Sequence, residues 1–406
     1  MTPQRGIPFV CATARVLTSR HRSTTFHLMA GLFTISRTTI LSSLLALALS
    51  VPGTTPAESP EEREFTHARP GYTYHFPFDH GSHDGFQTEW WYYTGHLKAN
   101  TGRTFGYQLT FFRRAVRHAS AAANPSRWTL RQLYFAHFAL TDEQQGSFHF
   151  AERISRAGIG KAGADATHLN VWIADWHAEM QGEAHLLRAR NEDIAVALNL
   201  TPEKLPIVHG REGISRKGDA EGEASHYYSF TRLHTDGTIT VDGHTFTVSG
   251  VSWMDHEFGS NQLGDVQEGW DWFSLQIDDG SELMVYRIRR RDGSLEPASG
   301  GTWIPRHGPA VPLNREAISI EILDHWTSPQ SGGRYPSRWR LNVPSVHLAM
   351  EIRPTLAQQE LVTQGSTQVT YWEGSVTATG TRDDRSVSAL GYAELTGYAT
   401  SLRKRL

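Results

Sequence analysis

Short segments in which apolar and polar residues alternate follow one another along most of the chain, whereas few segments have the spacing of an amphipathic helix. This alternation is typical of β-strands with one buried and one exposed face. Many short antiparallel strands leave unpaired edges unless the sheet closes on itself or packs against another sheet. The pattern therefore predicts an all-β protein.

Two strand-turn-strand blocks resemble each other and indicate a tandem repeat. The first spans residues 89–113 with a turn at Gly102, and the second spans residues 270–289 with a turn at Gly280, 178 residues later. A chain of 406 residues is long enough for two such units. We therefore expect two tandem antiparallel β-barrel domains. In the first block, alternation places four side chains on one face: Phe105, Tyr107, Leu109 and Phe111.

Two Asp-Gly pairs are the strongest turn signals, because this dipeptide suits the two-residue hairpin turns that need positive φ. Asp236-Gly237 and Asp242-Gly243 thus predict two successive tight turns after a strand at 227–233. Alternation predicts further strands at 132–140, 147–154, 168–177 and 184–190.

The N-terminal residues have the layout of a secretory signal. An apolar run at 40–51 precedes a stretch of small residues that ends at Ala57, and it is too short to span a membrane. We expect a signal peptide at 1–57, a true start at Met29, and a soluble periplasmic or secreted protein after cleavage. The only cysteine, Cys11, precedes the cleavage point, so the exported chain would contain no disulfide.

The remaining chain divides into three predicted parts. Residues 58–70 are acidic and flanked by proline, which indicates a flexible lead. We expect the N-terminal barrel at 71–260 and the C-terminal barrel at 261–406.

Charge and motifs exclude several classes of function. Lys and Arg number 39 against 42 Asp and Glu, a net charge of −3, which gives no basic field for nucleic acid. The chain also lacks a G-x-S-x-G elbow, a Walker loop, an H-E-x-x-H motif and a Rossmann glycine fingerprint. We therefore expect no nucleic-acid partner and neither a metal nor a nucleotide cofactor.

Polar residues at 79–89 form the first candidate cluster. His80, His83, Asp84 and Glu89 include metal-ligand side chains, but a glycine-rich loop with capping side chains explains them better. A third interpretation places them in a binding pocket.

The second cluster lies on a predicted strand, where alternation places Trp253, Asp255 and Glu257 on one face and Met254, His256 and Phe258 on the other. Burial of two neighbouring carboxylates raises the pKa of one of them, as a general acid near neutral pH requires. The alternative is a strand end whose acids are solvated or paired with arginine.

His226 and Tyr228 form a third cluster on one face of the strand that begins near residue 224. We expect adjacent antiparallel strands to bring these two side chains to the same wall as Asp255. A purely structural histidine is the alternative.

Four motifs, DHGSHDGFQTEWWYYTG, SHYYSFTRL, VSGVSWMDHEFGS and GYAELTGY, resemble the lipocalin-like family of carotenoid 1,2-hydratases (hydroxyneurosporene synthases) and the related AttH-type secreted hydrolases. The resemblance spans residues 72–398. It implies two lipocalin-like barrels and a cavity for a long apolar ligand.

The resemblance further implies cofactor-free hydration of an alkene. Asp255 would donate the proton, Trp253 and Tyr228 would stabilise the carbocation, and His226 would direct the water. We expect the remaining contacts with the substrate from Glu257, Trp270, Trp272, His83, Glu89 and Trp91.

Other functions remain open at this point. The same fold suits a carrier that binds a hydrophobic ligand without changing it, or an interaction module of the cell envelope. The expected partner in the first two cases is a hydrophobic small molecule, collected through at most transient membrane contact.

Overall fold

The computed structural model describes residues 65–116, 126, 129–261 and 264–399. The expected signal segment, including Met29 and Cys11, lies outside the described residues. Within the described part, the helices are short 3₁₀ turns, η1 (Phe78–His80), η2 (Arg315–Ala317) and η3 (Pro344–Val346), and no helix there is long and apolar enough to cross a membrane.

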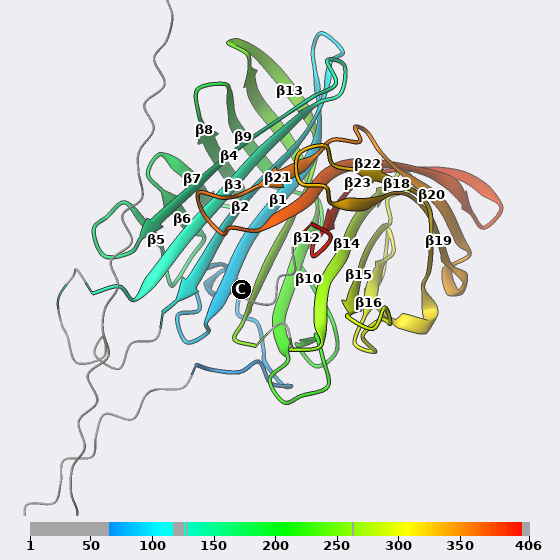
Figure 1. Cartoon of the computed structure of the whole chain (residues 1–406), viewed down its shortest axis with the longest axis horizontal. Coiled ribbons are helices and arrows are strands. Elements are labelled where there is room, and N and C mark those ends of the chain that lie inside the picture. Colours follow the sequence, from blue (N-terminus) through cyan, green and yellow to red (C-terminus); the bar gives the residue numbers. More distant parts are fainter. Residues whose placement is uncertain (1–64, 117–125, 127–128, 262–263, 400–406) are drawn as a thin grey trace, which may run out of the picture. The chain divides into compact units, whose positions relative to one another are not determined.

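The described strands form two sheets, which confirms the all-β prediction (Figure 1). The first sheet contains β1 (Thr88–Ala99), β2 (Thr104–Ala115), β3 (Gln132–Asp142), β4 (Ser147–Arg156), β5 (Ala162–Ala164), β6 (Asn170–Ile173), β7 (Trp176–Gln181), β8 (Ala184–Arg190), β9 (Ile194–Pro202), β10 (Ile207–Val208), β11 (Ser215–Arg216), β12 (Ala224–Val241) and β13 (His244–Gly259). The second contains β14 (Gln267–Ile277), β15 (Glu282–Arg290), β16 (Gly300–Ile304), β17 (Val311–Asn314), β18 (Ser319–Thr327), β19 (Arg334–Val343), β20 (Leu348–Pro354), β21 (Glu360–Val362), β22 (Thr370–Arg382) and β23 (Arg385–Leu395).

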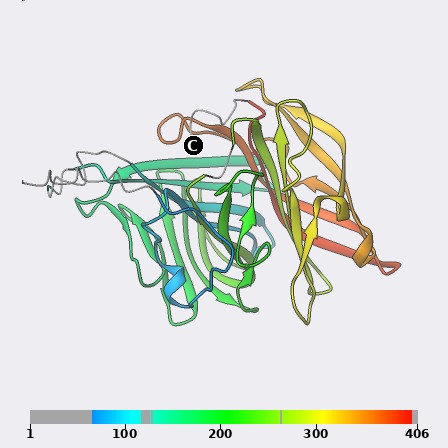
Figure 2. The same ribbon diagram turned by 90° about the horizontal axis from the view of Figure 1, so that it is seen from below.

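The two sheets repeat one topology, as the tandem pattern predicted. In each sheet the first strand pairs with the last, β1 with β13 and β14 with β23. The next three strands, β2–β4 or β15–β17, extend the sheet from the other edge of that first strand. The turn glycines Gly102 and Gly280 have nearly the same φ, 88° and 85°. The first sheet curls into a nearly closed barrel and the second into a half-barrel, and the two lie side by side (Figure 2).

Each sheet encloses its own core. Within the first barrel, Phe105, Tyr107, Leu109 and Phe111 are fully buried together, so alternation predicted their shared face correctly. A second core lies on the concave face of the second sheet. A third, smaller cluster joins side chains of both sheets, including Tyr92, Tyr227, Trp253 and Trp272. The outer face of β1, β12 and β13 is therefore covered by the second sheet.

Three local predictions were wrong. Segment 168–177 is not one strand, because Ala174 adopts φ 56° and turns the chain between β6 and β7. Asp236-Gly237 is not a turn but part of β12, and only Asp242-Gly243 turns. Part of the expected flexible lead is held against the fold, since the Thr66 N–H donates to the Gly85 carbonyl at 2.8 Å and Ala68 is buried, whereas Arg69 and Pro70 are exposed.

Gly237 has a different reason to be glycine. Its φ is +153°, and a Cβ there would lie 2.2 Å from the Ala197 carbonyl oxygen of β9. Glycine at this position permits a close approach of two strands, which is the other common role of glycine in a sheet.

Candidate functional site

Strand β13 separates two polar sites. Its alternation places Asp255 and Glu257 in a cavity between the sheets, with Trp253 in the aromatic cluster beside it. Met254 lies in the core of the first barrel, and His256 and Phe258 also lie on that side of the strand. The predicted division of β13 into two faces is confirmed.

The cavity has a volume of about 280 Å³, and both sheets contribute to its walls. Aromatic rings and carboxyl groups dominate the lining. The residues that line it on β-strands are Thr88, Trp90, Tyr92, Gln108, Thr110, Phe112, Arg114, Tyr227, Asp255, Glu257, Trp270, Trp272, Tyr286, Ile288, Tyr371, Glu373 and Glu394.

Asp255 is a carboxyl group of the cavity wall that three side chains of the first sheet hold in place. Its Oδ1 accepts hydrogen bonds from the Trp253 indole at 2.6 Å and from the Ser229 hydroxyl, and its Oδ2 accepts one from the Tyr227 hydroxyl at 2.9 Å. Burial raises the pKa of Asp255 to about 7, against the opposing effect of these three donors. Near neutral pH, Asp255 therefore exchanges a proton readily.

The second sheet adds two more buried carboxyl groups. The Tyr92 hydroxyl donates to Glu373 Oε1 at 2.6 Å, and the Trp270 indole donates to Glu394 Oε2 at 2.7 Å. Burial and repulsion by neighbouring carboxylates raise the pKa of Glu394 to about 7 and that of Glu373 well above its usual value. The cavity thus gathers carboxyl groups whose pKa values are raised, and Asp255 and Glu394 are about half protonated near pH 7.

Glu257 differs from these groups because it has a cationic partner. Lys217 Nζ lies 2.8 Å from Glu257 Oε1, and the Ser225 hydroxyl donates to the same oxygen. The Lys217 ammonium also lies 4.8 Å from the centre of the Tyr286 ring. Glu257 and Lys217 therefore form a neutral pair within the cavity wall.

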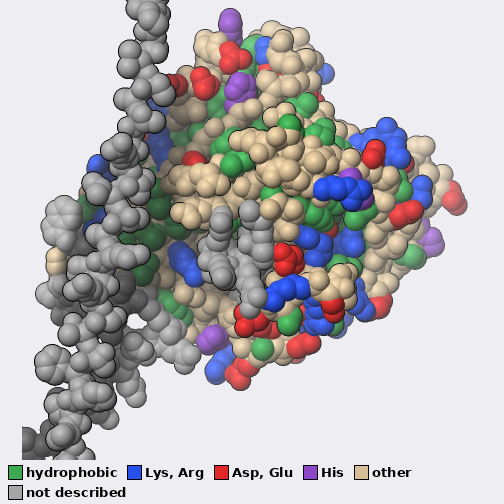
Figure 3. Space-filling model, in the orientation of Figure 1, with side chains coloured by type: hydrophobic (Ala, Val, Ile, Leu, Met, Phe, Trp, Pro, Cys, Tyr) green, Lys and Arg blue, Asp and Glu red, His purple; other side chains and the backbone are tan. Residues whose placement is uncertain are grey.

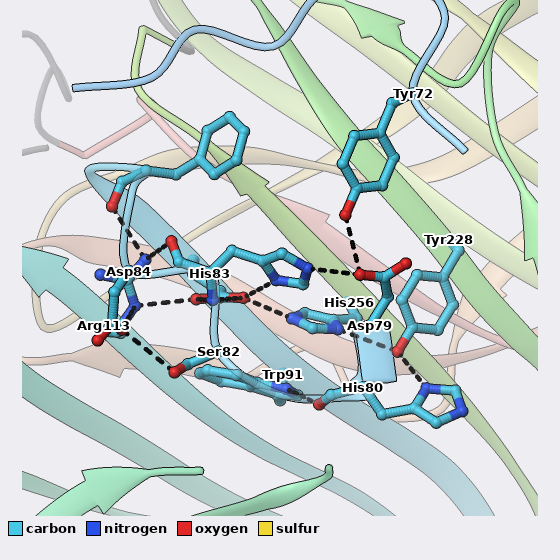
Figure 4. A network of polar contacts seen from close by, with 12 residues as sticks. Tyr72, Asp79, His80, Ser82, His83, Asp84, Trp91, Arg113, Tyr228 and His256 are labelled. Carbon is cyan, nitrogen blue, oxygen red and sulfur yellow. Dashed lines mark hydrogen bonds and ion pairs between the residues drawn. The ribbon is translucent and has the colours of Figure 1, made fainter. Parts of the chain in front are cut away.

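The second polar site lies on the opposite face of β13, inside the first barrel (Figure 4). Glu89 is its centre: Arg113 Nε lies 2.9 Å from Glu89 Oε2, while His83 Nδ1 and His256 Nε2 lie 2.8 and 2.9 Å from Oε1. His83 also bonds Asp79 at 3.2 Å. Hydrogen bonds to Asp79 and Glu89 raise the pKa of His83 to about 9, although burial acts in the opposite direction.

His83, Glu89 and His256 form a candidate metal donor set, because one ligand atom from each lies within 4.8 Å of the others. However, hydrogen bonds to Asp79 and Glu89 favour the protonated form of His83, which has no lone pair for a metal, and the fully buried Arg113 already pairs with Glu89. Two cations face two anions here, so the residues fit a balanced ion-pair network better than a metal centre.

His226 and Tyr228 do not share a wall with Asp255, contrary to the sequence-based expectation. A β-bulge between Phe230 and Leu233 shifts the register, so Tyr228 pairs with His256 rather than with Glu257. The Tyr228 hydroxyl contacts His80 Nδ1 at 2.7 Å and His256 Nδ1 at 3.0 Å. His226 Nδ1 bonds the Gly213 carbonyl at 2.8 Å.

The other predicted site residues divide between the two sites. Glu257, Trp270 and Trp272 line the cavity. His83, Glu89 and Trp91 belong instead to the network inside the barrel, where the Trp91 indole donates to the His80 carbonyl at 3.1 Å. Trp253 contacts Asp255 directly but is not among the lining residues.

Sequence reasoning missed several residues around Asp255. His209 Nε2 lies 2.6 Å from Ser229 Oγ, and its Nδ1 lies 2.9 Å from Thr302 Oγ1 of the second sheet. Ser229 stands between His209 and Asp255, so this is not the arrangement of a serine nucleophile activated by a histidine. Glu394 lies in the GYAELTGY motif, so the sequence could have indicated it as a site residue, whereas no motif marked Glu373.

Comparisons with known proteins agree on the fold. A family model described as AttH-like matches residues 67–398. An AttH protein from Nitrosomonas europaea is 34% identical, with a TM-score of 0.75 over 82% of this chain and 100% of that one. Kievitone hydratase from Nectria haematococca has a TM-score of 0.64 at 14% identity, over 84% of this chain and 98% of that one, which shows a shared fold. A search among curated proteins gave no match.

Proposed function

Given that the chain belongs to the AttH-like family, as its motifs predicted, we propose that it binds a hydrophobic small molecule in the cavity between its sheets and hydrates it, with Asp255 as the general acid. The observation that carries this proposal is the position of Asp255. It is a buried carboxyl group with a pKa of about 7, in a cavity whose walls are rich in indole and phenol rings.

The hydrogen bonds of Asp255 favour one position for its proton. Oδ1 already accepts two hydrogen bonds and Oδ2 accepts one. The acidic proton therefore resides on Oδ2, which keeps a free lone pair. An alkene carbon placed against Oδ2 would receive that proton, and the double bond would become a tertiary carbocation.

The cavity offers two kinds of stabilisation to such a cation. The rings of Tyr92, Trp270 and Trp272 present negative faces, and the Asp255 carboxylate formed by the proton transfer is itself an anion. Water then attacks the carbocation to form the C–O bond, and its released proton returns to Asp255. The net reaction adds one water molecule to one double bond and regenerates the acid.

Hydration is chosen over other acid-catalysed reactions for two reasons. The mechanism uses only groups that the cavity contains, and the fold is shared with a protein named as a hydratase. His226 has no part in it, because it lies on the far side of β12.

Charge distribution and the N-terminal segment support the proposed partner and location. On the face shown in Figure 3, basic and acidic side chains are interspersed, which does not favour a nucleic-acid partner. The aromatic lining of the cavity supports a small hydrophobic ligand. The signal-like segment before Ala57 supports export, with transient membrane contact to collect the ligand.

Extraction of bound lipid tests this proposal. The full chain is purified from its native host as wild type, Asp255→Asn and the hairpin control Asp242→Asn, and organic extracts are compared by mass spectrometry. We expect a hydrated lipid from wild type and from the control, and the unhydrated precursor from Asp255→Asn. The same unmodified ligand in all three proteins would contradict hydration and support the alternative function, a carrier.

A further inference from the structure

Arg114 is a cation of the cavity wall with no anionic partner among the described residues. It is half-buried at the end of β2, and no described carboxylate lies within ion-pair distance of it. Loss of solvent contact lowers the pKa of its guanidinium, since burial disfavours the charged form. Lys217, the other cation in the wall, is already paired with Glu257.

The strand register gives the position of Arg114 relative to Asp255. Arg114 of β2 pairs with Thr88 of β1, which pairs with Gly259 of β13. In the same way, Thr110 of β2 pairs with Tyr92 of β1, which pairs with Asp255 of β13. Four residues of β2 separate these two positions, about 13 Å at 3.3 Å per residue. Between them, Phe112 and Trp90 line the cavity. A cation thus stands at one end of an aromatic wall and Asp255 at the other.

The charges of the cavity favour an anion at the Arg114 end. Glu257 is neutralised by Lys217, and Asp255 and Glu394 are about half protonated near pH 7. Asp255 lies about 13 Å along the strands from Arg114, and no described carboxylate pairs with Arg114, so a ligand anion at this end of the cavity would balance its charge, since a partly buried cation left unpaired costs free energy.

We infer that the ligand is an amphipathic unsaturated acid whose carboxylate binds Arg114 while its apolar chain runs along Phe112 and Trp90 to bring a double bond to Asp255. This inference rests on the proposed function, because it assigns the ligand to the same cavity. Specificity would then come from the charge-assisted, bidentate contact between the ligand carboxylate and Arg114, and from the need for a double bond next to Asp255.

Three probes of matched chain length test the inference: farnesoic acid, its methyl ester and farnesylamine. Their dissociation constants are measured by quenching of tryptophan fluorescence for wild type, Arg114→Gln, Arg114→Lys and the exposed-arginine control Arg188→Gln. We expect wild type to prefer the acid over both other probes. Arg114→Gln should weaken binding of the acid about tenfold to a hundredfold and leave ester binding unchanged, with partial rescue in Arg114→Lys.

Either of two results would overturn the inference: equal affinity for acid and ester with no effect of Arg114→Gln, or tighter binding of farnesylamine, which would assign the cavity to an organic cation. Equal melting temperatures of the variants confirm that each is folded. Conversion of the probes in ¹⁸O-labelled water is followed separately by mass spectrometry. Asp255-dependent conversion without a preference for the acid contradicts only the role of Arg114, and Arg114-dependent binding without conversion contradicts only hydration.

Discussion

Asp255 and His256 are neighbours in the chain, yet their side chains belong to different polar sites on opposite faces of β13. Asp255 faces the cavity between the sheets, where Trp253 and Tyr227 donate to it. His256 faces the interior of the first barrel, where it bonds Glu89 and Tyr228. One strand thus supports a site with a proton-donating acid and, behind it, a network of fixed charges.

Ionisation of Asp255 should lower the stability of the protein as pH rises. Its pKa in the folded protein, about 7, lies above the ordinary 3.8, so the folded state binds the proton more tightly between these values. Between about pH 4 and pH 7, the unfolding free energy of wild type should therefore fall relative to that of Asp255→Asn by up to about 4 kcal/mol. Urea unfolding of both proteins across this range measures it.

The comparison with wild type isolates the titration of Asp255 together with its repulsion of Glu373 and Glu394. Burial lowers the pKa of His80, His185 and His209, and each of these histidines lowers stability as pH falls. Their contribution is common to both proteins and cancels in the difference. A difference that stays constant with pH would mean that Asp255 is already ionised at pH 4.

The network behind β13 should be a major source of stability. Glu89→Gln removes the closer of two carboxylate partners of the fully buried Arg113, because Asp84 Oδ1 lies at 3.9 Å and Glu89 Oε2 at 2.9 Å, and the loss costs about 3–5 kcal/mol. The matched control is Glu321→Gln, which removes an ion pair with Arg340 of similar length, 2.7 Å, but on the surface, and should cost less than about 1 kcal/mol. Equal losses in the two variants, measured by urea unfolding, would show that the buried pair has no special role.

Gly237 should tolerate alanine less well than a turn glycine does. Gly237→Ala introduces a Cβ against the Ala197 carbonyl, whereas Gly102→Ala at φ +88° meets open space. Both variants carry the strain of positive φ, so the additional loss in Gly237→Ala, about 1–3 kcal/mol, reports the steric clash. Thermal unfolding of the two variants measures this difference, and equal melting temperatures would contradict a close approach of β9.

Local sequence patterns predicted what depends on neighbours in the chain. Alternation gave the faces of β2 and β13 correctly, because the side-chain period of a strand is fixed by its geometry. The acidic, aromatic character of the Asp255 cluster was also visible. The repeated hairpins at Gly102 and Gly280 indicated the tandem architecture for the same reason.

Features that depend on register or on packing between sheets could not be predicted. The bulge after Phe230 carries no distinct sequence signal, yet it reverses which face of β12 meets Asp255 and so moves Tyr228 to the other site. Glu373 approaches the cavity from more than a hundred residues away, through the packing of the second sheet. Asp236-Gly237 was predicted as a turn, but glycine also occurs within strands where two backbones approach closely, as Gly237 does next to β9.

The protonation of Asp255 is the most direct test of the proposed acid. The side-chain carboxyl carbons of aspartate are labelled with ¹³C, which leaves Glu373 and Glu394 silent, and the signal absent from Asp255→Asn is followed by NMR as pH is varied. We predict that this signal titrates near pH 7. Titration near 3.8, the ordinary value, would show a carboxylate at neutral pH and contradict its role as the general acid.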